Sequence, residues 1–307
     1  MFRRIWKPWF VYRPIQLLKR VALPAAIPGY QPLSTSWGVP VLADPTKAIG
    51  QSIRTTGIYD LVVSESLARL VDPGDTAIDA GANVGYMSLL ASVAAGPAGR
   101  VISFEPHPEL FNILQRNVAA TAGRFRIASI ELHNVALGDS PGTAELVLPE
   151  DFSANDGVSQ IASSPIFGVR SIPVSVVALD DMLGDSFAGV LKLDVEGFEI
   201  HVLRGAMRAL ESRRIRHIVF EDHDVANSEV VRLLQTLGYR VFSIGWTMRG
   251  LALSPVESGT LATAYEAPNF IASIDPDSVV QRCAPRGWRV LRNLAARSSG
   301  RGLTSFR

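Results

Sequence analysis

The chain has 307 residues, of which 47% are hydrophobic and 19% charged, and these proportions exclude a wholly disordered protein. Its single cysteine, Cys283, excludes an internal disulfide framework, and no spacing of Cys and His suits zinc, so a reducing, cytoplasmic compartment fits best. The formal net charge of +1 is unevenly distributed, because six of the 30 bases lie in residues 1–20, seven lie in residues 282–307, and all 29 acids lie between these ends.

The first 20 residues read MFRRIWKPWFVYRPIQLLKR and mix bases with aromatic residues. Lys7, Pro8, Arg13 and Pro14 interrupt any apolar run, which excludes both a transmembrane helix of roughly 18 residues and the centre of a signal peptide. Two interpretations stay open for residues 1–20. They make a peripheral contact with anionic lipid at the inner face of the membrane, or they form an extension whose aromatic side chains pack on the domain.

From about residue 50, apolar strand-like runs alternate with amphipathic stretches, a pattern typical of βαβ units and a largely parallel sheet. We therefore expect an α/β fold with a doubly wound, seven-stranded, mostly parallel sheet and helices on both faces. The expected strands are 76–80, 100–105, 130–135, 189–194, 216–221, 239–244 and 269–274. The expected helices are 58–70, 85–95, 108–120, 197–211 and 228–237.

Three regions follow from this pattern. Residues 1–50 are expected to form a basic aromatic extension, residues 51–275 the main domain, and residues 276–307 a basic tail. Within the main domain, residues 139–178 break the alternation with Gly, Ser and Pro around two β-like stretches, so we interpret them as an insertion that could cover a site. The arginines of the tail suggest phosphate contacts, but a frayed basic terminus is favoured and no nucleic-acid partner is expected.

Acidic residues end four of the expected strands, where an open parallel sheet binds its ligands. They are Asp79, Glu105, Asp194 followed by Glu196, and Glu221 followed by Asp222.

The first strand ends in DAGANVG, residues 79–85, which resembles a nucleotide-binding turn but does not suit NAD. Asn83 replaces the middle glycine of the dinucleotide motif, and the carboxylate of Asp79 would repel a pyrophosphate. S-adenosylmethionine has no phosphate and carries a cationic sulfur and an ammonium. We expect Asp79 to bind its amino-acid end, Gly81 to let the backbone approach it, and Glu105 to accept hydrogen bonds from both ribose hydroxyls.

A purely structural interpretation of this stretch stays open, namely a tight strand-to-helix turn with a capping Asn83 and glycines at 81 and 85. The later sequence NVALGD, residues 134–139, has two interpretations as well. Around Ala136 its backbone lies beside the adenine, or Gly138 and Asp139 form a hairpin turn.

Six motifs occur in an order that resembles the FkbM-type family of S-adenosylmethionine-dependent methyltransferases over about residues 55–245. They are GIYD, PGDTAIDAGANVGYMSLLA, GRVISFEPHPELFNILQRNV, NVALGD, LDD and LKLDVEGFEIHVLRGA. The resemblance implies a class I methyltransferase fold (Rossmann-like) and O-methylation of a hydroxyl on a sugar, glycan, glycolipid or polyketide-type natural product. Where the family commonly has Glu after the tyrosine of its YE motif, this chain has Asp60 after Tyr59.

The cofactor-binding residues expected from the turn and from the resemblance can be named by position. They are Asp79, Gly81, Ala82, Asn83, Gly85, Glu105, Pro106, Ala136 and Asp194.

Methyl transfer to an alcohol needs a base near the methyl group, since the hydroxyl proton has to be accepted. Asp194 and Glu196 end one strand while Glu221 and His223 end its expected neighbour, so Asp194, Glu196 and His223 are the catalytic candidates. We favour Glu196 as the base, because crowded carboxylates raise a pKa, with His223 as its competitor. A structural interpretation of Glu196, as a helix-opening acid paired with Lys192 or Arg204, also stays open.

A magnesium ion on Asp194, Glu221 and Asp222 is possible in principle but not favoured, and His107 and His133 are interpreted as structural. The favoured partner is a small-molecule or glycan acceptor. The alternative function is a non-catalytic S-adenosylmethionine-binding or membrane-adaptor protein that keeps the fold. Retention of Asp79, Glu105, Asp194 and Glu196 together favours the enzyme.

Overall fold

The structure is a computed structural model that describes residues 8, 12, 24–148, 160–162, 170–222, 228–259 and 268–295. Of residues 1–20 it describes only Pro8 and Tyr12, so the membrane contact stays a prediction. The candidate base His223 also lies outside the described residues.

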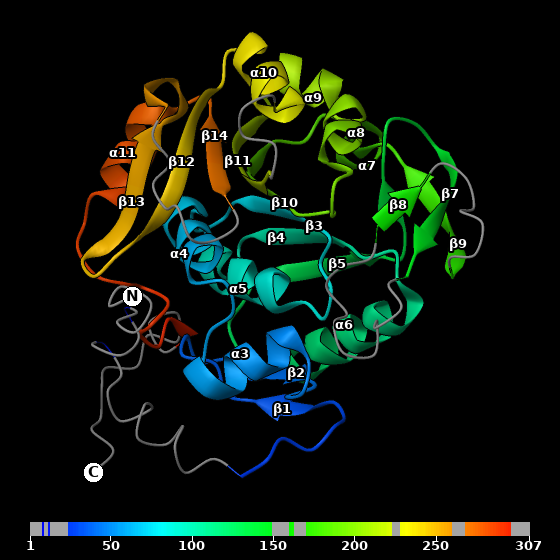
Figure 1. Ribbon diagram of the computed structural model, residues 1–307, viewed down its shortest axis with the longest axis vertical. Coiled ribbons are helices and arrows are strands. Elements are labelled where there is room, and N and C mark those ends of the chain that lie inside the picture. The colour runs from blue at the N-terminus through cyan, green and yellow to red at the C-terminus, as the bar shows by residue number, and fades with distance from the viewer. Residues whose placement is uncertain are drawn as a thin grey trace.

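The central sheet has, among the described residues, eight strands in the order β13-β12-β14-β11-β10-β3-β4-β5 (Figure 1). The five strands from β11 to β5 are parallel, whereas β14, β12 and β13 run antiparallel to their neighbours. The doubly wound, mostly parallel sheet predicted from the sequence is therefore confirmed. Its strands are β3 (Thr76–Ala80), β4 (Arg100–Phe104), β5 (Ser129–His133), β10 (Ala188–Leu193), β11 (Ile215–Glu221), β12 (Arg240–Thr247), β13 (Gly250–Pro255) and β14 (Asn269–Ser273).

The prediction of seven strands was one short, because β13 was missed. This strand pairs with β12 as a hairpin whose connecting residues are Met248 and Arg249. Such tight turns usually carry Asn-Gly or another glycine pair, and their absence here hid the hairpin.

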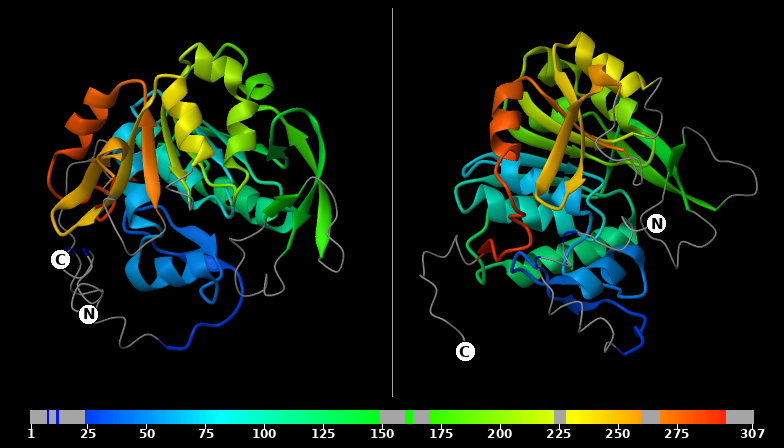
Figure 2. Two further views of the ribbon diagram at one scale, coloured as in Figure 1. Left: turned by 45° about the horizontal axis from the view of Figure 1, so that its top comes forward. Right: turned by 60° about the vertical axis from the view of Figure 1, so that its left-hand side comes forward.

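Helices cover both faces of the sheet, and none in the described part of the chain is long and apolar enough to cross a membrane (Figures 1 and 2). One face carries α3 (Ala48–Thr56), α4 (Leu61–Leu70), α5 (Tyr86–Ala95), α6 (Pro108–Thr121) and α11 (Pro276–Cys283). The other face carries α7 (Leu179–Leu183), α8 (Glu199–Arg204), α9 (Met207–Glu211) and α10 (Glu229–Thr236). A 3-10 turn, η2 (Val256–Ser258), follows β13.

Alternate residues of the strands supply two hydrophobic cores, since successive side chains of a strand point to opposite faces. On β10, Val190 joins the core under α4 and α5, while Leu191 joins the core under α7 to α10. On β3, Ala77 and Ile78 divide in the same way. The buried central strands are therefore apolar almost throughout, which is why the sequence identified them.

Two expected helix boundaries were wrong. The helix expected at 58–70 begins at Leu61, because the Asp60 side chain accepts a hydrogen bond from the Val63 amide (3.0 Å) and caps it. The helix expected at 197–211 is divided into α8 and α9. Between the two helices the chain makes a tight turn, in which the Ala206 amide donates a hydrogen bond to the Leu203 carbonyl (3.1 Å). Gly205 lies in this turn, and only glycine fits there, because an added Cβ atom would lie 2.0 Å from the Gly138 carbonyl oxygen.

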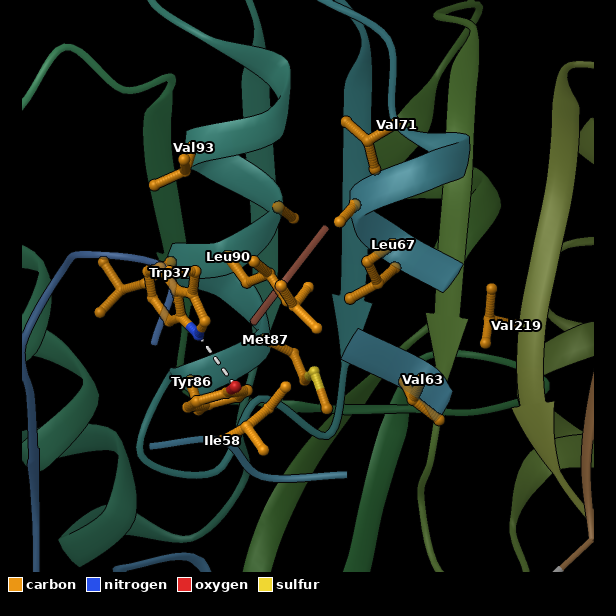
Figure 3. Close-up of a cluster of buried hydrophobic side chains, with 14 of the residues drawn as sticks. Trp37, Ile58, Val63, Leu67, Val71, Tyr86, Met87, Leu90, Val93 and Val219 are labelled. Carbon is orange, nitrogen blue, oxygen red and sulfur yellow. Dashed lines mark hydrogen bonds between the residues drawn. The ribbon is translucent and has the colours of Figure 1, made fainter. Parts of the chain in front are cut away.

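Residues outside the expected main domain share its core. Trp37, which lies between the short strands β1 (Gln31–Leu33) and β2 (Val41–Ala43), and Trp288, after α11, are both buried with α4 and α5. The Trp37 indole donates a hydrogen bond to the Tyr86 hydroxyl (2.8 Å), and their rings meet edge to face at 5.4 Å (Figure 3). The described parts of residues 1–50 and 276–307 are thus packed into one body with the sheet.

Among the described residues, the insertion contributes β7, β8 and β9 to a separate four-stranded sheet in the order β6-β9-β7-β8, in which β6 comes just before the insertion. This sheet projects from the domain beyond β5 in both views of Figure 2. Its own small core includes Leu146, Val174 and Val176. The stretches expected to be β-like at 143–148 and 172–177 are two of these strands. The four are β6 (Ala136–Leu137), β7 (Gly142–Val147), β8 (Gln160–Ala162) and β9 (Ser171–Val177).

A buried ion pair fastens the segment after α11 to α4. The Arg69 guanidinium lies 2.6 Å from the Glu65 carboxylate and also donates to the Gly287 carbonyl (2.7 Å), and both side chains are fully buried. The same carboxylate accepts the backbone amides of Arg289 (2.9 Å) and Val290 (3.0 Å). Because Tyr59 and Asp60 precede α4, this network also holds the start of that helix in place.

The Arg69→Met substitution should lower the free energy of unfolding by about 3–5 kcal/mol, because it leaves a buried carboxylate without its cation. Urea titration followed by circular dichroism measures this loss. The matched control is Arg204→Met, since Arg204 pairs with Glu229 at the surface and the two side chains are 50% and 64% exposed, so a change of less than about 1 kcal/mol is expected there. Equal losses in the two variants would contradict the assigned importance of the buried pair.

Candidate active site

A cavity lies over the carboxyl ends of β3, β4, β10 and β11. The chain places β4 and β5 on one side of β3 and later places β10 and β11 on the other, so the strand order reverses here. The cavity holds about 1020 Å³ of space when the part that is open to solvent is included. The predicted site residues that line it are Gly81, Ala82, Asn83, Glu105, Pro106, Ala136, Asp194, Glu196 and Glu221.

The turn after β3 brings bare backbone to the cavity. Gly81 has φ +78°, and a Cβ atom there would lie 2.0 Å from the Asp194 carbonyl oxygen, so no other residue fits. Asn83 also has a positive φ, of 51°, and its side chain accepts a hydrogen bond from the Val84 amide (2.7 Å). Gly85 does not line the cavity, because its Cα faces Leu114 of α6, whose Cδ1 would lie 2.4 Å from an added Cβ.

Glu105, just after β4, lines the cavity while being only 5% exposed. One carboxylate oxygen accepts the Asn83 amide (2.7 Å) and the other accepts the His107 amide (2.8 Å). Burial raises the pKa of Glu105 to about 7, although these two hydrogen bonds oppose the increase. Each oxygen has further acceptor capacity, so the group can still receive hydroxyl donors.

Asp79 lies elsewhere than the sequence suggested. It is buried, does not line the cavity, and accepts a hydrogen bond from the Ser88 hydroxyl (2.6 Å). Its other oxygen lies 3.2 Å from the ammonium of Lys192. This geometry makes Asp79 the counter-ion of a buried lysine, and a direct contact with a ligand ammonium, which we expected, has no support here.

The Lys192 ammonium connects the turns that follow β3 and β10. It donates to the Gly81 carbonyl (2.8 Å), and it lies 3.3 Å from the Asp194 carboxylate as well as 3.2 Å from that of Asp79. Burial alone would lower the pKa of Lys192, but the Asp194 and Asp79 carboxylates raise it, so the side chain is cationic. From the sequence, we expected Lys192 only as a possible ion-pair partner of Glu196.

The turn after β10 presents Glu196 to the cavity in a strained conformation, with φ +55°. The Glu199 carboxylate accepts the Val195 amide (3.1 Å) and the Gly197 amide (3.2 Å), which holds this conformation. Burial, followed by repulsion from Asp194, Glu221 and other carboxylates, raises the pKa of Glu196 to about 7. A carboxylate with this pKa can accept a proton near neutral pH.

Tyr59 and Asp60 complete the lining next to Glu196, and sequence analysis did not include them among the site residues. Burial raises the pKa of the Tyr59 hydroxyl. Negative charges raise it further, and they belong to Asp194, Asp60, Glu221 and Glu196. Asp60 also has a positive φ, of 36°. Four described non-glycine residues have a positive φ, and three of them line this one cavity, namely Asp60, Asn83 and Glu196. In the sequence, the motif GIYD contains both residues and could have indicated their place in the site.

The metal candidates do not converge. Glu221 lines the cavity, but Asp222 accepts a hydrogen bond from Ser228, the N-cap residue of α10. Among the described residues, no group of three His, Cys, Asp or Glu side chains is arranged to hold a metal ion. His107 caps α6 by accepting the Glu109 amide (3.2 Å), and His133 lies 2.7 Å from Glu131, so both histidines have structural contacts.

The residues around the cavity fit S-adenosylmethionine. The backbone of Gly81 to Asn83 lines it, and the Glu105 carboxylate, which also lines it, keeps acceptor capacity for hydroxyl groups. Ala136 and Leu137 of β6 together with Pro106 add small and apolar surface suited to a purine ring. The insertion contributes Leu146 and Ile161, so part of it does border the site, while 149–159 and 163–169 lie outside the described residues.

Comparison with known proteins agrees with this geometry. The family described as "Methyltransferase FkbM domain" matches residues 79–241. The 31-O-demethyl-FK506 methyltransferase FkbM of Streptomyces tacrolimicus is 33% identical over 200 residues, 55% of this chain and 74% of that protein. Methyltransferase 1 of Beauveria bassiana is 30% identical over 211 residues, 63% and 74% of the two chains. The hexuronic acid methyltransferase AglP of Haloferax volcanii is 26% identical over 185 residues, 58% and 70%.

The family match covers more than half of this chain, and it includes the turns after β3, β4 and β10 that border the cavity. The chain therefore belongs to the FkbM methyltransferase family, whose members depend on S-adenosylmethionine.

Proposed function

We propose that this protein is an S-adenosylmethionine-dependent O-methyltransferase that acts on a hydroxyl of a sugar, glycan, glycolipid or polyketide-type natural product. The observation that carries the proposal is Glu196, a strained, half-buried carboxylate in the cavity with a pKa of about 7. A hydroxyl nucleophile has a proton to lose, so its methylation benefits from such a base. A carboxylate acceptor is already ionised and would need none.

The names of the relatives support this choice of acceptor. One is named for a 31-O-demethyl natural product and another for a hexuronic acid, so both names point to oxygen-rich small molecules or sugars.

When bound, S-adenosylmethionine supplies an electrophilic methyl carbon on a cationic sulfur. In our proposal Glu105 accepts hydrogen bonds from its ribose hydroxyls, and the backbone of Gly81 to Asn83 contacts its amino-acid end. Asp194, held by Lys192, orients the acceptor beside Glu196. The Glu196 carboxylate then takes the hydroxyl proton as the acceptor oxygen forms its new bond to carbon and the carbon–sulfur bond breaks.

The non-catalytic alternative is less well supported. A protein that only binds the cofactor would have no use for a strained acidic residue with a pKa near neutrality. The alternative base His223 lies outside the described residues, and it remains the competitor of Glu196 in the test below.

Glu105→Ala should weaken binding of the product S-adenosylhomocysteine roughly 10- to 100-fold, because hydrogen bonds to a charged group each contribute about 1.5–3 kcal/mol. Isothermal titration calorimetry measures the affinity. Glu109→Ala is the matched control, since Glu109 is an exposed glutamate in the first turn of α6. If both variants bind like the unaltered protein, Glu105 does not contact the ribose.

Glu196→Gln should reduce methyl transfer roughly 100-fold or more while leaving S-adenosylhomocysteine affinity within about twofold. The assay follows transfer of labelled methyl groups into an extract of the source organism. Because the active form of Glu196 is deprotonated, the rate of the unaltered protein should rise with pH and reach half its maximum near pH 7, in line with the raised pKa.

At saturating S-adenosylmethionine, where titration of Glu105 no longer limits cofactor binding, the Gln variant should lose this dependence on pH, since the side chain at position 196 then has no proton to release in that range. Glu211→Gln, an exposed glutamate at the end of α9, is the control and should retain the rate and its pH profile. Full activity of Glu196→Gln would remove Glu196 as the base and direct attention to His223.

A further inference from the structure

We propose that a group of exposed arginines beside the β12–β13 hairpin binds anionic membrane lipids and thereby holds the cavity next to a bilayer. We call this group the arginine surface and define it by Arg249, Arg286, Arg289 and Arg292, all of which are exposed. It is a second site of the molecule, separate from the cavity. The inference therefore does not depend on methyl transfer, and the two can fail independently.

Two segments that are distant in the sequence meet at the arginine surface. The Gly287 amide donates a hydrogen bond to the Arg249 carbonyl (2.7 Å), which joins the segment after α11 to the turn of the hairpin (Figure 1). An added Cβ atom on Gly287 would lie 3.7 Å from the Arg292 guanidinium, so that side chain reaches the same place. Arg286 precedes Gly287 directly and Arg289 follows two residues later. Four exposed arginines thus share one small area.

Three of these arginines keep their charge available. In the described part of the chain, no carboxylate lies close enough to form an ion pair with Arg249, Arg286 or Arg292. Arg282 of α11 differs from them, because its guanidinium donates to both carboxylate oxygens of Asp72 (2.6 and 2.8 Å). Grouped cations repel one another, so an external anion stabilises the arginine surface.

Described residues near both ends of the chain lie at or next to this surface. Tyr12 packs against the core, and its hydroxyl donates to the carbonyl of Met248 (3.3 Å), the neighbour of Arg249 in the hairpin turn. At the other end, the last described residue is Ala295, three positions after Arg292. Residues 1–20 and 296–307, which flank these points in the sequence, contain six and three bases respectively and no acid. The charge of both ends therefore adds to that of the arginine surface.

An anionic bilayer is the partner that this composition favours over a nucleic acid. Residues 1–20 combine their bases with Trp6, Trp9 and Phe10. Aromatic side chains of this kind are enriched at the level of the lipid head groups, where the ring meets acyl chains and the polar edge meets water. Arginines beside them are attracted by the negative surface potential of the membrane. Nucleic acid would satisfy the charges alone.

The arginine surface lies at the edge of the sheet that carries the cavity. β12 is antiparallel to β14, which is antiparallel to β11, so β12 and β11 point in the same direction. Glu221, at the end of β11 and in the cavity, pairs with Asn269 of β14, and Asn269 pairs with Ile244 of β12. Since β12 continues to Thr247, the hairpin turn extends beyond the level of Glu221 by about 10 Å. A bilayer bound at this turn would face the cavity edge of the domain.

Vesicle flotation of the purified full chain tests the inference. Vesicles of phosphatidylcholine that also contain phosphatidylglycerol should bind the chain at low salt, and vesicles of phosphatidylcholine alone should bind it roughly tenfold less tightly or worse. Raising the salt concentration should release the chain from the anionic vesicles, because counter-ions screen the attraction between exposed charges.

The triple variant Arg249→Gln, Arg286→Gln and Arg292→Gln tests the residues themselves. Its affinity for the anionic vesicles should fall roughly 100-fold, since each arginine near such a surface contributes roughly fivefold. Its thermal unfolding, followed by circular dichroism, should match that of the unaltered protein, because the three side chains are exposed.

A matched control removes the same number of charges from another place. Arg116→Gln, Arg124→Gln and Arg126→Gln together alter three exposed arginines in α6 or just after it. The affinity of this variant for the anionic vesicles should stay within about threefold of the unaltered value, because these charges lie outside the arginine surface.

Two results would overturn the inference and leave the proposed methyl transfer untouched. One is equal binding to the two kinds of vesicle, and the other is an equal loss of affinity in the two triple variants. Tighter binding to a short DNA or RNA duplex than to the anionic vesicles, at the same salt concentration, would overturn it as well and identify a nucleic acid as the partner. Loss of methyl transfer with vesicle binding retained would refute only the proposed function.

Discussion

The ammonium of Lys192 lies at the junction of the two turns, after β3 and after β10, that border the active site. It joins the Gly81 carbonyl on the turn after β3 to the Asp194 carboxylate on the turn after β10, and Asp79 supplies the second negative charge. Ser88 and Ser103 extend the chain of hydrogen bonds from Asp79 into α5 and β4. Burying a lysine is unfavourable unless it is paired, so these contacts fix one relative position of the two turns.

Backbone strain is concentrated where the two turns meet. Asn83 and Glu196 adopt positive φ angles, and Gly81 approaches the Asp194 backbone too closely for any side chain. Such conformations persist only when their surroundings enforce them. The hydrophobic cores on the two faces of the sheet, together with the buried Glu65–Arg69 pair of α4, provide that rigidity.

Charge is divided along the cavity in a way that matches the chemistry proposed for it. Near the turn after β4, a single buried acid, Glu105, lies among apolar and small residues. Next to the turns after β10 and β11, burial and then repulsion from Asp194 and Glu221 raise the pKa of Glu196 to about 7, which keeps this group close to its protonation midpoint at neutral pH.

Local patterns in the sequence were enough to locate the seven expected strands, the acids at their ends and the glycine turn after β3, because burial on both faces and tight turns impose short-range constraints on residue type. They did not reveal that Asp79 faces Lys192, that Tyr59 and Asp60 reach the site, or that Trp37 and Trp288 belong to the core. Each of these depends on contacts between distant parts of the chain, as between Lys192 and Ala80, 112 positions apart. Such contacts arise only when the sheet assembles, since side-chain partners across neighbouring strands leave no periodic signal in either segment alone.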